Sequence, residues 1–311
     1  MYRTNAQSRM LEETFVKANI PYKLVGAHRF YDRKEIMDIL AYLRLVANPD
    51  DSMSFARVVN EPKRGIGATS ITKLQNFADM HGISLYEAGK SVDLTGIPAR
   101  TAKKITEFCD MLKLFHQVQK KATITEMTEQ ILSITGYQKA LNDANTLEAK
   151  GRLENLEEFL SVTKEFDENW DPEDEESDPF TDFLADLALV SDQDGVDQND
   201  DVVTLMTLHA AKGLEFPVVF LIGMEEGIFP LGRAAMNESD LEEERRLAYV
   251  GITRAEEKLY LTNALSRMLY GRTQQNTASR FIGAISDALL ESANETVKHS
   301  SYPFSSGPVA V

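Results

Sequence analysis

Polar side chains suited to a ligand site cluster between residues 204 and 216, in the stretch TLMTLHAAKGLEF. The stretch begins as an apolar, β-branched strand and continues into Thr207, His209, Gly213 and Glu215. Ligands of open α/β sheets bind beyond the carboxyl ends of the strands, so polar groups at this point indicate a site. Taken alone, His209 is more typical of a structural residue, and the prediction depends on the cluster.

A second cluster, EEERRLAYVGITRAEEK, covers residues 242–258. On a helix, Glu242 lies three and four residues before Arg245 and Arg246, and such pairs stabilise a helix by about 0.2–0.5 kcal/mol each. Helix pairing does not explain Arg254, which stands just before a predicted strand. A guanidinium presents a fixed fork of donors that matches a phosphate group. Arg254 is therefore a candidate phosphate ligand.

A third candidate is the segment PKRGIG at residues 62–67, which lies between two helical patterns. Glycines allow the backbone to approach a phosphate, and the free N–H groups of the following helix point at it. The candidate phosphate-contacting residues are Lys63, Arg64, Gly65, Ile66 and Gly67. The alternative is a plain turn between two helices. Since backbone N–H groups do not read base sequence, nucleic-acid binding here would be non-specific and would weaken with salt.

The tripeptide Gly-Lys-Ser at residues 89–91 matches the end of a phosphate-binding loop, but the glycine before it is Gly82. Six residues separate the two glycines where that loop requires four, and no strand precedes them. The segment has a helical pattern instead. We therefore predict that it forms a helix and binds no nucleotide.

The elements that must position these residues alternate between strand and helix at the two ends of the chain. Apolar strands are predicted at residues 22–25, 202–208, 218–222 and 258–262, with an amphipathic helix at 7–18. Near-continuous apolar strands separated by helical patterns are typical of a parallel sheet that is covered on both faces. The two ends are therefore predicted to complete one α/β domain.

The middle of the chain is predicted to be helical. Asp32 and Glu35 resemble a capping box that starts a helix, and apolar residues then recur at helical spacing up to Asn48-Pro49. Further helical patterns cover residues 52–59, 68–80, 101–119, 125–133 and 146–166. This all-helical block is an insertion between the two α/β pieces, with boundaries near residues 30 and 200.

The composition is that of an ordinary soluble globular protein: 311 residues, 43% hydrophobic and 26% charged, enough for about two domains. The one cysteine, Cys109, excludes an internal disulfide; it is predicted to be a small buried hydrophobe in a reducing compartment. No apolar run approaches the roughly 18 residues of a membrane span, and the N-terminus lacks a signal-peptide layout. A cytoplasmic location without a membrane partner is the expectation.

The net charge of −16 argues at first sight against a nucleic-acid partner, because phosphates attract Lys and Arg. The acids are concentrated, however: 16 of the 49 lie between residues 165 and 201, a stretch without Lys or Arg. The other 33 equal the chain's 33 basic residues, so the remainder is neutral and has room for basic patches. The acidic stretch is predicted to be a solvated connector with one short helix at 180–190, and the alternative is a specific docking site.

The two chemical clusters resemble motifs V and VI of superfamily 1A DNA helicases of the PcrA/UvrD/Rep group. The opening YRTNAQSR is similar to the motif that follows motif IV in that group. Three central segments are similar to its helical 2B insertion: FYDRKEIMDILAYLRLVANPDD, PKRGIG and GRLENLEEFLSVTKEF. Order and spacing agree from residue 2 to about residue 285.

The resemblance implies a motor of two RecA-like α/β domains that hydrolyses ATP between them and moves 3′ to 5′ on single-stranded DNA. This chain would contribute the second RecA-like domain, 2A, from residues 1–30 and 201–290. The helical domain 2B with its acidic connector would occupy residues 31–200, and residues 291–311 would form a flexible tail. The expected fold class is thus a RecA-like parallel-sheet domain interrupted by an all-helical insertion domain.

Site roles follow from the same resemblance. Arg254 matches the arginine finger of motif VI, which faces the γ-phosphate, and Glu215 matches the residue that binds the ribose, with Gly213 in the same nucleotide-side loop. The positions near the single-stranded DNA path are Arg3, Asn5, Thr207 and His209. The family's glycine loop, here Gly65–Gly67 with Lys63 and Arg64, contacts duplex DNA. No metal site is predicted in this chain.

The phosphate-binding loop, the magnesium-binding Asp-Glu pair and motif IV of the family lie upstream and are absent here, so the chain looks truncated. We expect ATP and Mg²⁺ to act in the full-length enzyme and this fragment to bind neither tightly. Expected partners are single-stranded and duplex DNA, the missing N-terminal RecA-like domain, and repair or transcription proteins. The alternative is a non-enzymatic DNA-junction or protein-docking module.

Overall fold

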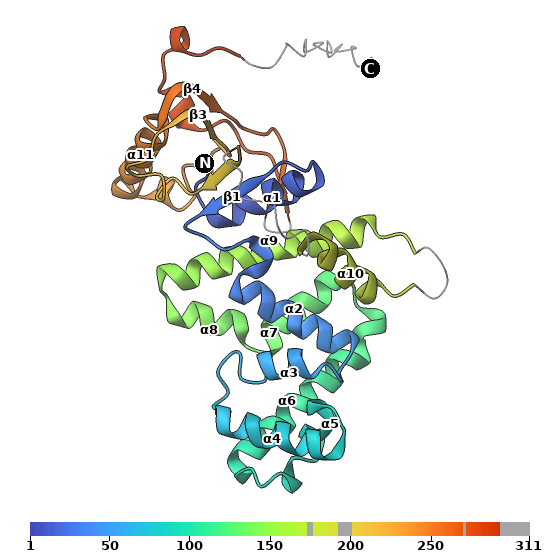
Figure 1. Ribbon diagram of the computed structural model, residues 1–311. Coiled ribbons are helices and arrows are strands. Elements are labelled where there is room, and N and C mark those ends of the chain that lie inside the picture. The colour runs from blue at the N-terminus through green and yellow to red at the C-terminus, as the bar shows by residue number, and fades with distance from the viewer. Residues whose placement is uncertain (173–176, 192–200, 270–271, 293–311) are drawn as a thin grey trace, which may run out of the picture.

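The computed structural model describes residues 1–172, 177–191, 201–269 and 272–292. An α/β part that contains both ends of the described chain lies beside an elongated helical part (Figure 1). The helices are α1 (Ser8–Lys17), α2 (Lys34–Ala47), α3 (Ser52–Val58), α4 (Ala68–His81), α5 (Leu85–Lys90), α6 (Ala99–Val118), α7 (Ile124–Ile134), α8 (Tyr137–Ala144), α9 (Leu147–Asn169), α10 (Pro179–Ser191), α11 (Glu238–Ile252) and α12 (Arg280–Gly283). The strands are β1 (Tyr22–Val25), β2 (Val203–Met206), β3 (Phe216–Leu221), β4 (Ala255–Leu261), β5 (Arg267–Leu269) and β6 (Arg272–Gln274).

The predicted strands pair in parallel, β1 with β2 and β3 with β4. The first two residues of the chain lie between these pairs. Tyr2 forms a parallel bridge with Thr207, while the Met1 amino group donates to the Phe220 carbonyl and the Met1 carbonyl accepts from the Ile222 N–H. Residues far apart in the sequence are thus joined in the order β1, β2, residues 1–2, β3, β4. The antiparallel hairpin of β5 and β6 was not predicted.

Only one face of the β3–β4 pair is covered in the described part of the chain. Val219 and Leu221 are buried in a core shared with α11, where Gly251 allows a close approach. On the other face Phe220 is 50% exposed and stacks on Tyr260, with ring centroids 4.5 Å apart. The prediction that both faces are covered is therefore wrong for this pair, because no described helix packs on the second face.

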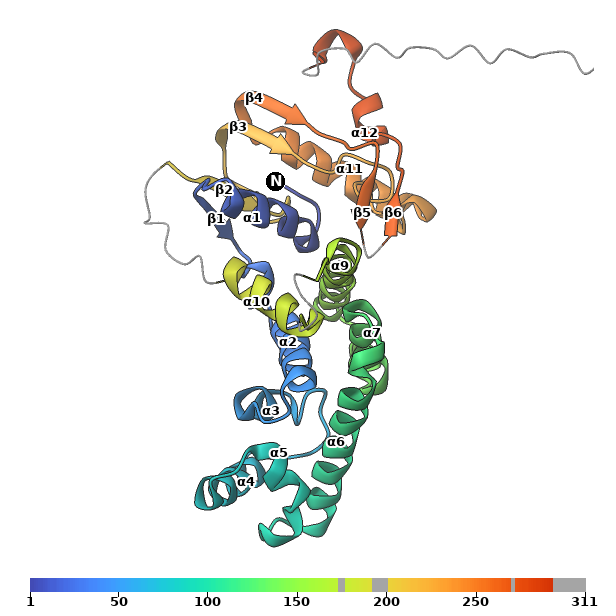
Figure 2. The ribbon, with the colours of Figure 1, turned by 90° about the vertical axis from the view of Figure 1, so that its right-hand side faces the viewer.

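The helical core is built around α2, which is buried on most of its circumference. The predicted helical spacing places Ile36, Ile39, Leu43 and Val46 in the interior, each 0% exposed. Helices α3, α6, α7, α9 and α10 contact α2. Figure 2 shows the long helix α6 running from the end of this part that is farthest from the strands towards α7. The helical part thus has its own hydrophobic core.

The start of α2 differs from the prediction. The helix begins at Lys34, its N-cap residue is Arg33, and no side chain caps it. Asp32 instead ends a short 3-10 turn, and the Glu35 carboxylate accepts from the Asn155 side chain at 2.5 Å. The predicted capping box is therefore wrong, because a partner on α9 takes the Glu35 carboxylate that would have closed it.

The other predicted helices are present with ends shifted by up to three residues, and α8 and α12 were not predicted. The Gly-Lys-Ser segment is helical, as expected: Gly89 lies in α5, and a side chain there would meet the Cys109 sulfur at 2.6 Å. Cys109 itself is buried, as predicted, and burial raises its thiol pKa to about 12.

A buried polar network joins α1 of the α/β part to the helical part. Arg9 Nε donates to Glu158 Oε1 at 2.8 Å, and both side chains are 2% exposed. Arg33 donates to Asn155 Oδ1 and to Ser8 Oγ, each at 2.8 Å. These contacts cross from α1 and the start of α2 to α9, so the two parts meet at a specific polar interface.

Parts of two predicted segments lie outside the described residues. The acidic connector is described except for residues 173–176 and 192–200, and its predicted short helix is α10. Almost all of the predicted tail, from residue 293 on, also lies outside. No helix in the described ranges combines the length and hydropathy needed to cross a membrane.

Candidate functional site

Arg254 lies immediately after α11 and before β4, with its guanidinium held by three neutral acceptors. Nε donates to the Val250 carbonyl at 2.9 Å, Nη1 to the Leu214 carbonyl at 2.9 Å, and Nη2 to Thr253 Oγ1 at 3.0 Å. The side chain is only partly buried, and no carboxylate pairs with it among the residues that the structure describes. Its positive charge is therefore oriented but not neutralised, which suits an incoming anion.

The same arginine fixes the loop that carries Glu215. Leu214 accepts from the guanidinium, and the Phe216 N–H donates to the Arg254 carbonyl at 2.9 Å. Glu215, between these two contacts, is exposed. Gly213 makes the preceding turn with φ +86°, which favours glycine. The structure thus brings together the three residues predicted on the nucleotide side.

Thr207 and His209 follow the end of β2. Thr207 Oγ1 accepts from the Ala210 N–H at 3.3 Å, which shapes the turn after the strand. His209 is exposed on this turn. Partial desolvation and then the positive charge of Arg3 lower the pKa of the His209 imidazole, against an opposing effect of Glu244. The ring is therefore predominantly neutral at neutral pH.

Arg3 has an internal partner that the sequence did not reveal. Its Nη2 donates to Glu244 Oε1 at 2.7 Å and its Nε to Glu244 Oε2 at 3.1 Å, a bidentate pair. Glu244 is 5% exposed and also accepts from the Leu231 N–H. Arg3 thus connects the first residues of the chain to α11, the helix that ends at the Arg254 site.

Asn5 lies close to Arg3 in the chain, in the short 3-10 helix Asn5–Gln7. Its Oδ1 is buried and accepts no hydrogen bond within the described part of the chain. A buried polar atom without a partner costs free energy. Asn5 therefore holds a buried acceptor that has no partner among the described residues.

The glutamates before Glu244 behave as surface residues of α11. Arg245 pairs with Glu242 at 3.0 Å, as predicted, whereas Arg246 pairs with Glu243 at 2.8 Å instead of with Glu242. All four side chains are about half exposed or more. The one member of the EEE run that is buried is thus Glu244, and its pair with Arg3 could not be deduced from the run itself.

The loop at residues 62–67 divides into an inward and an outward half. Arg64 turns inward: it donates to the Val58 carbonyl at 3.0 Å and to the Tyr42 hydroxyl at 2.8 Å, and its guanidinium lies 5.0 Å from the Phe108 ring centre. Ile66 is 1% exposed and its N–H donates to Asn60 Oδ1.

The outward half consists of Lys63, Gly65 and Gly67, all exposed. Gly67 is the N-cap residue of α4 and no side chain caps that helix, so its first N–H groups face solvent. Arg64 and Ile66 thus anchor the loop, and the groups left for a ligand are one lysine and the backbone.

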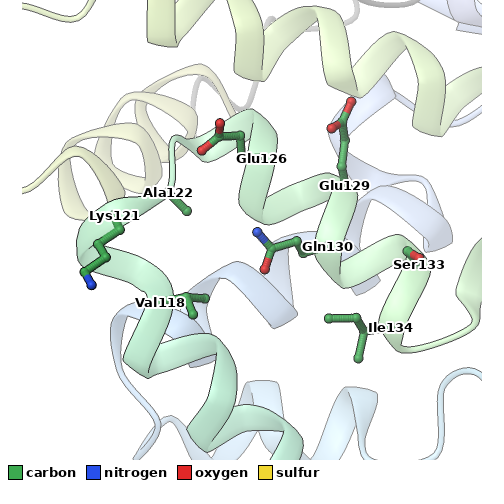
Figure 3. Close-up of a pocket in the computed structure, with 8 residues that line it drawn as sticks. All are labelled: Val118, Lys121, Ala122, Glu126, Glu129, Gln130, Ser133 and Ile134. Atoms are coloured by element: carbon green, nitrogen blue, oxygen red, sulfur yellow. The ribbon is translucent and has the colours of Figure 1, made fainter.

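A pocket of about 510 Å³ lies elsewhere, between the C-terminal end of α6 and α7 (Figure 3). Its lining combines apolar and charged side chains: Val118, Lys121, Ala122, Glu126, Glu129, Gln130, Ser133 and Ile134. None of the predicted site residues is among them. The candidate site is therefore the surface around Arg254 and the strand ends, and not this pocket.

Comparison with known proteins identifies relatives whose sequences match nearly the whole chain, including the residues of this surface. Residues 1–266 match the family model of the UvrD-like helicase C-terminal domain. The chain is 59% identical to the ATP-dependent DNA helicase PcrA of Leuconostoc citreum over 295 residues, which cover 94% of this chain and 39% of that protein. It is 54% identical to the helicase of the same name from Bacillus subtilis, over 95% of this chain and 40% of that protein.

The PcrA helicase of Staphylococcus aureus is 47% identical over 310 residues, 98% of this chain and 42% of the relative. The chain thus spans about two-fifths of the length of the relatives that it matches. The matched residues include the Arg254 loop, the Arg3 segment and the loop at 62–67. The chain belongs to the UvrD-like helicase C-terminal domain family.

Proposed function

We propose that this chain is the C-terminal portion of an ATP-dependent 3′–5′ DNA helicase and supplies the arginine finger to the ATP site. One observation carries the proposal: the Arg254 guanidinium is oriented by neutral acceptors and bonded to the carbonyl of Leu214, directly beside the exposed Glu215. Arg3 and Arg9, which have structural roles here, are paired with carboxylates. Arg64 also donates to neutral acceptors, but it is turned inward against Tyr42 and Phe108, whereas Arg254 lies beside the exposed Glu215.

The residues present fit one side of a bound ATP. Arg254 would hold the γ-phosphate, since its charge is not neutralised, and Glu215 would accept a hydrogen bond from the ribose. ATP would supply the phosphoanhydride bond whose hydrolysis drives movement. The phosphate-binding loop and the Mg²⁺ ligands would come from the part of the longer relatives that this chain does not cover. This is why we expect the fragment alone to bind nucleotide weakly.

The overall architecture supports the same assignment. We propose that residues 1–30 and 201–290 form the RecA-like domain 2A, because the strands of both segments pair in parallel and Met1–Tyr2 joins the two pairs. Residues 31–200 would form domain 2B. The partners would then be the N-terminal RecA-like domain, DNA, and repair or transcription proteins in the cytoplasm.

Single-stranded DNA would pass the strand ends at Thr207 and His209. Both follow β2, and the unpartnered acceptor of Asn5 lies in the segment that follows Tyr2, which pairs with Thr207. Neutral His209 can accept or donate a hydrogen bond to sugar or phosphate groups. Arg3 would hold the first residues of the chain against α11 through its pair with Glu244, and its positive charge would keep His209 neutral.

Duplex DNA would contact the loop at residues 62–67. Lys63 supplies a charge, and Gly65 and Gly67 allow the backbone and the first N–H groups of α4 to approach a phosphate. Arg64 and Ile66 hold the loop from behind. Because these contacts read only the phosphate backbone, binding should be independent of sequence and should weaken steeply with salt.

The test is a chimera in which this chain replaces the matched 40% of the Bacillus subtilis relative. A helicase portion should give DNA-stimulated ATP hydrolysis and 3′–5′ unwinding, whereas the remaining part of the relative alone should give neither. The alternative, a non-enzymatic junction or docking module, predicts a folded chimera that binds DNA and hydrolyses no ATP. That result would refute the proposed function.

A further inference from the structure

The duplex-contacting loop has a counterpart elsewhere in the helical part. Residues 65–67 read Gly-Ile-Gly and residues 96–98 read Gly-Ile-Pro. The first glycine of each has a left-handed backbone, with φ +73° at Gly65 and +66° at Gly96. Each isoleucine is buried, and each loop leads directly into a helix, α4 or α6.

The two loops are tied to each other by a pair of lysines. Lys73 lies eight residues after Gly65, and its Nζ donates to the Gly96 carbonyl at 2.9 Å. Lys104 lies eight residues after Gly96, and its Nζ donates to the Arg64 carbonyl at 2.5 Å. Each helix thus sends one lysine to the loop that begins the other helix. The arrangement is reciprocal, as expected for two copies of one unit that face each other.

The Lys104 bond bears directly on the duplex-contacting loop. Its acceptor is the carbonyl just before Gly65, and a Cβ atom on Gly65 would lie 2.7 Å from the Lys104 ammonium. The N–H groups of Arg64 and Ile66 are meanwhile held by Asn60 Oδ1 at 2.9 and 3.0 Å. Lys104 therefore holds the loop through the Arg64 carbonyl, and Asn60 holds it through the N–H groups of Arg64 and Ile66.

We propose that Lys104 is a positioning residue for duplex binding: it holds the 62–67 loop in shape through the Arg64 carbonyl, as one half of a reciprocal clamp with Lys73. This inference rests on the proposed duplex-binding function of the loop. Lys104 acts through the loop backbone and not through a phosphate. Lys103, its neighbour on α6, is 78% exposed and contacts only Glu107, at 3.9 Å, among the described salt bridges.

Lys103 therefore offers a matched control, since Lys103→Met and Lys104→Met remove the same charge from adjacent positions. The assay is anisotropy of a labelled DNA duplex with this 311-residue chain, starting at about 50 mM salt. Lys104→Met should bind about fivefold to tenfold more weakly than the wild type, the effect of losing one partly exposed hydrogen bond that holds the loop. Lys103→Met should change affinity by less than about twofold, and Lys104→Arg should restore most of the loss.

The dependence of affinity on salt separates positioning from phosphate contact. Removing a lysine that touches a phosphate lowers the salt slope by about one, so Lys63→Met should lower it and Lys104→Met should leave it unchanged. Hydrogen exchange in the peptide at residues 60–67 should rise in Lys104→Met while α4 stays protected. If Lys104→Met does not fold, Lys104→Gln, with a shorter donor, should give an intermediate loss.

Three results would overturn the positioning role: unchanged affinity of Lys104→Met, an equal loss in Lys103→Met, or a reduced salt slope in Lys104→Met. A wild-type chain that binds no duplex, or whose binding ignores Lys63→Glu, would instead refute the proposed duplex contact itself, and the role of Lys104 with it. The two outcomes can be told apart, because failure of the duplex contact is seen with Lys104 unchanged, whereas failure of the positioning role is seen only in the Lys104 variants.

Discussion

The ion pair of Arg3 with Glu244 predicts that Arg3 stabilises the folded chain, whether or not it also lies near DNA. Arg3→Met removes a bidentate partner from a carboxylate whose side chain is 6% exposed, while Arg3 itself is 16% exposed. Breaking a fully buried pair costs about 3–5 kcal/mol, and an exposed pair is worth about 0–1 kcal/mol. For this nearly buried pair we expect a loss of about 2–3 kcal/mol, because Glu244 then keeps only the Leu231 N–H among the described residues.

The assay is urea or thermal unfolding, with a fall in melting temperature of roughly 3–5 °C for a chain of 311 residues. Adding Glu244→Leu to Arg3→Met should restore more than half of the lost stability, since no unpaired charge then stays buried. Arg246→Met on the same helix is the control, because its pair with Glu243 is about 70% exposed and should cost less than about 0.5 kcal/mol. Additive losses in the double variant, or a cost of Arg3→Met no larger than that of the control, would refute the reasoning.

Two further predictions concern the same surface. The His209 imidazole should titrate below the ordinary histidine pKa of about 6.5 in an NMR titration, and Arg3→Met should raise it, since desolvation comes first and Arg3 second among the causes. Because the folded state disfavours the protonated ring, His209 should contribute to loss of stability as the pH falls through about 6.5, and a pKa that Arg3→Met leaves unchanged would contradict this assignment. Gly251→Ala should cost about 1–3 kcal/mol in urea unfolding, since its Cβ would lie 2.4 Å from a Leu208 methyl carbon and 3.1 Å from one of Leu221. Gly151→Ala in α9, where a Cβ meets nothing within 4 Å, should instead be neutral or stabilising, and equal effects at the two glycines would count against the packing argument.

The spacing of apolar residues in the sequence predicted the helices that pack against many other apolar side chains. The long helix at 101–119 was found within two residues, because it buries a regular apolar face that includes Ile105, Cys109 and Leu112. The strand at residues 22–25 was found with its bounds, although none of its residues is buried. Hairpin β5–β6 was missed because it is short and contains polar residues such as Arg267 and Gln274, so it has no alternating apolar pattern.

Local polar pairs such as Arg245 with Glu242 were predicted, but polar contacts between residues far apart in the sequence could not be. Glu35 was expected to close a capping box on its own helix, and it instead pairs with Asn155, 120 residues away. Arg64 was a candidate phosphate contact, and its partners in the structure are Tyr42 and backbone carbonyls. A local sequence window shows a charge but not the group that neutralises it.

The candidate site itself was predicted in outline. The glycine turn before Glu215 and the position of Arg254 before a strand indicated two polar segments, and the structure connects them through the Leu214 carbonyl. The hydrogen bond from Lys104 to the 62–67 loop was not predicted. The repeated Gly-Ile pairs at residues 65–66 and 96–97 could have indicated that the two loops are related.

The most direct test of the central claim is the ATP hydrolysis rate of the chimera with Arg254→Ala. An arginine that stabilises charge during phosphoryl transfer contributes about 10³- to 10⁵-fold to kcat, so the variant should lose at least about 1,000-fold. Its affinity for single-stranded DNA should stay within about twofold of the unsubstituted chimera, and Arg245→Ala should hydrolyse ATP normally. An Arg254→Ala chimera that retains full ATP hydrolysis would contradict the claim that this guanidinium completes the nucleotide site.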